Sequence, residues 1–130
     1  MVVVQGCAVP QYRIRIVPST DYDSLPMFDE IVVDRLLLSL SRTELSDLMA
    51  FVPEEGRRVL IELTHAKKTG DLSPVQVAAH GLRGAAGNFG LARMEAIARA
   101  MNNKEATLEE METLAPYLER CIDALDEELS

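Results

Sequence analysis

The sequence has no tryptophan, and aromatic residues make up only 5% of its 130 residues, although 48% of the residues are hydrophobic. The core must therefore be built from leucine, valine, isoleucine, alanine and methionine, a composition that suits the packing of helix against helix. A chain of this length is expected to form one domain that is large enough to bury a core.

Cysteine is also scarce: Cys7 and Cys121 are the only two, and they have neither CxxC nor metal-ligand spacing. The pair is typical of reduced thiols in a cytoplasmic protein. Cys121 falls on the apolar face of a predicted helix, where we expect it to belong to the core. No cluster of histidine, cysteine and acidic residues has metal-ligand spacing either, so no metal site is expected in this chain.

Long hydrophobic runs and positive charge are lacking as well. No apolar run reaches the roughly 18 residues of a membrane span, and the opening MVVVQGC lacks the basic residues and the long apolar stretch of a signal peptide. A net charge of −8 argues against nucleic acid as the main partner, because phosphate binding needs a basic surface. No P-loop spacing is present, so the chain is not expected to bind ATP. We expect a cytoplasmic protein with no membrane or nucleic-acid partner.

Residues 1–28 do not share the pattern of the rest of the chain. Residues 12–17 alternate between polar and apolar like a strand, but no second strand exists to pair with them. Pro18, Pro26 and the acidic residues between them are typical of a loop. We therefore expect an N-terminal arm over residues 1–28, irregular, partly disordered or packed across the rest, and a helical domain over residues 29–130.

From Asp29 onward, apolar residues recur at helical spacing. A first amphipathic helix is expected to end near residues 39–41. Ser41 and Glu44 then fit the capping box that begins a second helix, with Thr43 as an alternative cap.

Proline and glycine divide the middle of the chain. Pro53 should kink the second helix or split it, because proline removes a hydrogen bond and clashes with the preceding turn. Two lysines and Gly70 are typical of the end of that helix. Ser73, followed by a proline and by Gln76, predicts the capped start of a central helix, which Gly90 ends.

Two more helices follow. One covers residues 91–101 and is stopped by two asparagines, and the other begins with a capping box at Thr107 and runs to the end of the chain. Pro116 should bend this last helix or mark its effective first turn. The predicted fold is all-α, an up-down antiparallel four-helix bundle with an extra N-terminal segment and helix.

The central helix has an unusual polar face. With about 100° per residue, these residues lie within roughly 60° of His80: Ser73, Gln76, Arg83, Gly84 and Gly87. The opposite side is apolar. Gly84 and Gly87 each lower the stability of the helix by up to about 1 kcal/mol relative to alanine. A need for another molecule to approach this face closely explains the two glycines better than packing does. The alternative is that His80 is an ordinary surface histidine and that Gly87 and Gly90 only end the helix.

The stretch His80-x-Leu82-Arg83-Gly84-Ala85-Ala86, followed by Phe89-Gly90 and a new helix, resembles the signature of histidine-containing phosphotransfer (HPt) domains. These domains are the four-helix-bundle intermediates of bacterial multistep phosphorelays, and the phosphotransfer domain of chemotaxis kinases carries a similar motif. The helical pattern extends the resemblance over roughly residues 34–129. It implies a phosphotransfer protein that carries a phosphoryl group on His80 between receiver-domain aspartates, without kinase activity of its own.

Each residue on the polar face then has an expected role. Imidazole can accept a phosphoryl group and return it, which makes His80 the phosphoacceptor. Arg83 can stabilise the phosphoryl oxygens, although the family usually has lysine at this position, a difference that would slow or retune transfer. The resemblance implies that Gly84 gives steric clearance for the receiver, and Gly87 extends it. Gln76 has two competing assignments: a hydrogen bond to the ring or phosphoryl group, or the capping box of its own helix.

The implied partners are response-regulator receiver domains and a hybrid sensor histidine kinase, and a monomer is expected. No cofactor is expected in this chain, and the Mg²⁺ that transfer requires would belong to the receiver. Three alternatives stay open: a transfer-inactive docking module that regulates a receiver or kinase, a purely structural bundle, and a chemotaxis-type domain phosphorylated directly by a kinase.

Overall fold

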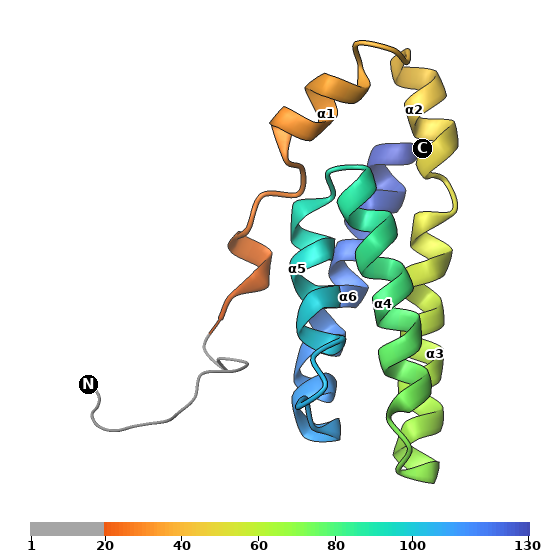
Figure 1. Cartoon of the computed structure of the whole chain (residues 1–130), viewed down its shortest axis with the longest axis vertical. Helices are drawn as coiled ribbons and strands as arrows, with labels where there is room; N and C mark the ends of the chain where they lie inside the picture. The colour runs from red at the N-terminus through yellow and green to blue at the C-terminus, as the bar shows by residue number, and fades with distance from the viewer. Residues whose placement is uncertain (1–19) are drawn as a thin grey trace, which may run out of the picture.

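The computed structural model describes residues 20–130, and within them every regular element is helical. Four helices form an up-down bundle (Figure 1): α3 (Val52–Thr69), α4 (Ser73–Asn88), α5 (Ala92–Met101) and α6 (Leu108–Leu129). The packed pairs α3–α4, α4–α5, α5–α6 and α6–α3 close a ring around one core. The predicted all-α four-helix bundle with an additional N-terminal helix is confirmed. The strand-like pattern over residues 12–17 lies outside the described residues.

The bundle core is aliphatic and sulfur-containing, as the composition predicts. Its largest fully buried side chains are Val52, Val59, Val75, Leu82, Leu91, Met94, Ile97, Met101, Met111, Leu114, Leu118 and Leu125. Cys121 is buried among them with a free thiol, and this burial raises the pKa of the thiol to about 11. No helix within the described residues is both long enough and apolar enough to cross a membrane.

Local signals place most helix ends where the sequence predicts them. Helix α2 (Arg42–Met49) begins with a capping box in which Ser41, rather than Thr43, is the cap. Pro53 lies in the first turn of α3, so the proline splits α2 from α3 instead of kinking one long helix. Gly70 ends α3 with φ of 78°, a left-handed conformation that favours glycine.

The predicted cap of α4 is wrong. Ser73 is already the first helical residue, and its N–H donates to the Asp71 carboxylate at 3.0 Å. Leu72 occupies the cap position, where no side chain caps the helix. With Leu72 as the cap, Gln76 is the fourth helical residue, whereas a capping box needs its partner at the third. The side chain of Gln76 contacts another part of the chain instead. Pro116 lies inside α6, not in its first turn.

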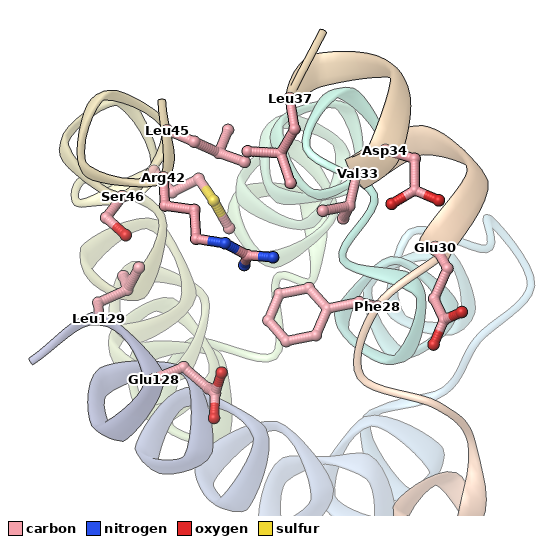
Figure 2. Close-up of a pocket in the computed structure, with 11 residues that line it drawn as sticks. Phe28, Glu30, Val33, Asp34, Leu37, Arg42, Leu45, Ser46, Glu128 and Leu129 are labelled. Carbon is pink, nitrogen blue, oxygen red and sulfur yellow. The ribbon is translucent and has the colours of Figure 1, made fainter. Parts of the chain in front are cut away.

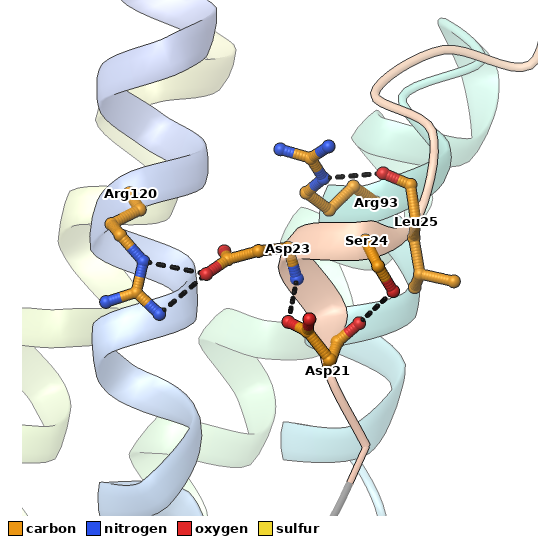
Figure 3. A network of polar contacts seen from close by, with 6 residues as sticks. All are labelled: Asp21, Asp23, Ser24, Leu25, Arg93 and Arg120. Atoms are coloured by element: carbon orange, nitrogen blue, oxygen red, sulfur yellow. Dashed lines mark hydrogen bonds and ion pairs between the residues drawn. The ribbon is translucent and has the colours of Figure 1, made fainter.

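Residues 20–37 are here called the strap, and the first part of this segment lies against α5 and α6 (Figure 3). They contain the short 3-10 helix η1 (Tyr22–Ser24) and α1 (Glu30–Leu36), which Asp29 caps. The carboxylate of Asp23 pairs with Arg120 of α6 at 2.9 Å, and Arg93 of α5 donates to the carbonyl of Leu25 at 2.8 Å. The strap therefore fastens to two bundle helices.

A hollow lies between α1, α2 and the end of α6 (Figure 2). Phe28 and Arg42 point into it, and Glu30, Asp34 and Glu128 are among its lining residues. None of its lining residues belongs to the polar face of α4.

Gly90 joins the strap to the bundle. It adopts φ of 68° after α4, and its carbonyl accepts the N–H of Asp29 at 2.7 Å. A Cβ added at Gly90 would lie 2.9 Å from the Cβ of Val32 and 3.2 Å from the carbonyl oxygen of Asp29. Both the backbone conformation and the close approach of α1 therefore require glycine here.

Two glycine substitutions should separate these requirements. Gly70→Ala is expected to lower the free energy of unfolding by about 1–2 kcal/mol, because Gly70 has positive φ but open space around it. Gly90→Ala should cost about 1–3 kcal/mol more, since Val32 must also move. Urea unfolding of both variants measures the difference, and equal losses would show that the contact with α1 contributes nothing.

Candidate functional site

The histidine face of α4 points out of the bundle. Val75, Ala79, Leu82 and Ala86 on the same helix are fully buried, whereas His80 is exposed. Helix α4 is held from both sides, by α3 and α5, so the histidine sits at mid-length on a packed, rigid support. This is the orientation that the apolar periodicity predicts.

Gly84 leaves the surface beside His80 open. A Cβ built at Gly84, one turn after the histidine, would meet no atom within 4 Å. Gly87 differs, because a Cβ there would lie 3.2 Å from a carboxylate oxygen of Glu95 on α5. The clearing next to His80 is therefore centred on Gly84, and at Gly87 the carboxylate of Glu95 partly fills the space.

Two shallow hollows meet at His80. One is lined by His80, Arg83, Gly84, Gly87, Asn88 and Glu95. The other is lined by Ser73, Gln76, Val77, His80, Asn102 and Lys104. Each of the five predicted site residues lines at least one of them, so the fold brings together the residues that the helical spacing placed on one face.

The side chain of Arg83 is half-buried and lies toward the end of α5. Its Nη1 donates to Oδ1 of Asn102 at 3.5 Å, and Nδ2 of Asn102 donates to the backbone carbonyl of Gln76 at 3.1 Å. The side-chain amide of Gln76 donates to the carbonyl of Asn103 at 3.4 Å. Gln76 therefore connects α4 to the loop after α5, and the predicted capping-box role for it is wrong.

Positive charge predominates around His80. Arg83 and Lys104 line the two hollows beside the histidine. The nearby carboxylate of Glu95 pairs with Arg99 one turn further along α5, at 3.1 Å. An anionic group at His80 would therefore be attracted by two cations, while Arg99 offsets the nearest negative charge.

Sequence reasoning missed Val77, Asn102 and Lys104. Val77 lies three residues before His80, and Arg83 lies three residues after it. Val77 is 73% exposed. In the sequence, the signal for Val77 is that it is an isolated apolar residue on the otherwise polar face of the helix. In the sequence Asn102 indicates only the end of a helix, because nothing local shows that its side chain reaches α4. No group of three or more potential metal ligands occurs among residues 20–130.

A model of the Hpt domain family matches residues 36–128, which include α2 and nearly all of the bundle. The chain belongs to the Hpt domain family. The Hpt domain carries out histidine phosphotransfer in two-component phosphorelays, where it interacts with receiver domains and kinases. No curated protein and no solved structure gives a significant match to this chain. Most of the strap, residues 20–35, lies outside the family match.

Proposed function

We propose that this Hpt domain is a phosphoryl carrier in which His80 accepts the phosphoryl group of a receiver aspartyl phosphate and passes it to a second receiver aspartate. The observation that carries the proposal is the combination of an exposed histidine, open space over Gly84 and a guanidinium one turn away on the same face. The bundle supplies position and charge, which is most of what phosphoryl transfer requires of a protein.

The proposed step is an in-line displacement at phosphorus. The Nε2 lone pair of a neutral His80 ring attacks the phosphorus of the acyl phosphate, and the bond from phosphorus to the aspartate oxygen breaks. The aspartate leaves as a carboxylate, and the ring keeps its Nδ1 proton until solvent removes it. Return of the phosphoryl group to another aspartate is the same sequence in reverse. Each His80 carries one phosphoryl group at a time, and the proposed role is that of a carrier without kinase activity of its own.

The docking surface proposed for the receiver surrounds His80. Gly84 lets the receiver backbone approach the helix, and exposed Val77 offers an apolar contact one turn before the histidine. Arg83 would contact the phosphoryl oxygens, Gly87 would widen the approach, and Gln76 would hold the nearby loop. The Mg²⁺ of the reaction belongs, in this proposal, to the receiver.

The proposed setting is the cytoplasm, with the chain acting as a monomer between a hybrid sensor histidine kinase and a response regulator. A monomer leaves the His80 face free for one receiver at a time. The identity of each partner is set by residues around His80 on both proteins.

The test is transfer in both directions. A panel of receiver domains, charged with acetyl phosphate and freed of the donor, is mixed with the chain, and label is followed on both proteins. Acid-labile, base-stable label that moves to the chain and then to a second, uncharged receiver supports the carrier. Tight binding of a receiver, with its phosphate left in place, would favour a docking module that does not transfer.

A further inference from the structure

Asn102 joins the two turns of α4 that flank His80. It stands at the C-terminal cap of α5, and its amide contacts α4 at two points. Nδ2 donates to the carbonyl of Gln76, one turn before the histidine, while Oδ1 accepts from Arg83, one turn after it. A single half-buried side chain from the neighbouring helix therefore contacts both of the turns that flank His80.

The orientation of this amide is determined by both contacts. If oxygen and nitrogen were exchanged, the amide NH₂ would face the guanidinium and the amide oxygen would face the Gln76 carbonyl, which opposes donor to donor and acceptor to acceptor. With the observed orientation, one N–H of the Arg83 guanidinium is used by Asn102. No other hydrogen bond of this guanidinium occurs within residues 20–130, and Arg83 lines the same hollow as His80.

This contact restrains an otherwise flexible side chain. A free arginine samples many rotamers and loses that freedom when it binds an anion. An arginine already restrained beside the nucleophile loses less, so more of its interaction with the phosphoryl group lowers the barrier. Lysine, usual at this position in the resemblance described above, presents a single ammonium group in place of this planar fork.

We propose that Asn102 is a positioning residue for phosphoryl transfer: it holds the Arg83 guanidinium along the His80 face so that the fork is pre-oriented for the phosphoryl oxygens. This inference rests on the proposed function of His80. Asn102 acts through Arg83 and not through the fold of the bundle.

A double-mutant cycle with Arg83 tests this role. Asn102→Ala should lower the rate of transfer at saturating receiver by about three- to tenfold, with the half-saturating receiver concentration changed less than about twofold. In an Arg83→Ala background the same substitution should have no further effect on the rate, because the residue through which it acts is gone. Full additivity of the two substitutions, or a wild-type rate for Asn102→Ala, would overturn the proposal.

Asn103→Ala is the matched control. Asn103 lies on the same loop, and its side chain accepts the N–H of Glu105 at 2.9 Å without contacting Arg83. Asn103→Ala should change the rate of phosphoryl transfer less than about twofold, even if it lowers thermal stability as much as Asn102→Ala does. Equal rate losses in both variants would show a structural effect of the loop and overturn the proposal.

An NMR arm separates this inference from the proposed function. The mobility of the Arg83 side chain, measured by NMR relaxation of its Nε–H group, should rise in Asn102→Ala and stay unchanged in Asn103→Ala. Both results should hold whether or not phosphate is present. Unchanged mobility in Asn102→Ala overturns the positioning role while leaving phosphoryl transfer by His80 intact. A wild-type chain that accepts no phosphoryl group overturns both, and the transfer assay identifies that case.

Discussion

Replacing His80 with glutamine is expected to reduce phosphoryl acceptance from a charged receiver to background, a loss of at least about a thousandfold. Glutamine is polar, of similar size and a good helix former, so the exposed position tolerates it. It has no ring nitrogen lone pair with which to attack phosphorus, and neither hollow beside position 80 contains a second imidazole. The measurement is the rate of label transfer, with circular dichroism to verify the helix content.

His65→Gln is the matched control for this prediction. His65 is the other histidine of the chain, is also exposed, and lies on α3 with its Nδ1 3.7 Å from a carboxylate oxygen of Glu62. The carboxylate of Glu62 beside it would repel a phosphoryl group, whereas Glu95, which lines the hollow of His80, is paired with Arg99. His65→Gln should transfer at the wild-type rate, and a His80→Gln protein that accepts phosphate normally would contradict the assignment.

Gly84→Gln is expected to give a protein that is at least as stable as the wild type but transfers phosphate about a hundredfold more slowly or worse. Because a Cβ at Gly84 meets no atom within 4 Å, the new side chain can begin there without displacing a neighbour in the free protein. Replacing an interior helix glycine should raise the free energy of unfolding by up to about 1 kcal/mol. The same side chain fills the space next to His80 that a docked receiver would need.

Receiver binding and transfer are both measured for this variant, and Gly81→Gln serves as its control. Gly81 lies in the same helix, and a Cβ there would be 3.8 Å from a carboxylate oxygen of Glu55, toward α3 and away from the clearing. Gly81→Gln should gain similar helix stability and lose far less transfer. Wild-type transfer by Gly84→Gln would show that the clearing has no role in docking.

The sequence predicts features whose cause is local. The capping boxes at Ser41 and Thr107 are correct because cap and partner are three residues apart and need no other part of the chain. The outward face of α4 follows from its apolar periodicity. The predicted start of α4 is wrong because Asp71 accepts the N–H of Ser73, and the N–H of Gln76, which a Ser73 cap would bind, donates to the carbonyl of Leu72 at 3.0 Å.

Features that depend on distant residues could not be predicted. Gln76 bonds to Asn103, 27 positions away, and the strap pairs Asp23 with Arg120, 97 positions away. Nothing in the local sequence of either partner indicates such a contact. The same holds for Gly87, since the carboxylate that partly fills its space comes from the next helix.

Locating the phosphoryl group on the chain tests the assignment of His80 as the phosphoacceptor. The wild-type chain is charged by a phosphorylated receiver, digested under alkaline conditions that preserve phosphohistidine, and mapped by mass spectrometry. If His80 is the phosphoacceptor, the digest contains one phosphoryl group per chain, acid-labile, base-stable and confined to His80. Label on His65, acid-stable label on a hydroxyl group, or no label with any receiver of a broad panel would contradict this assignment.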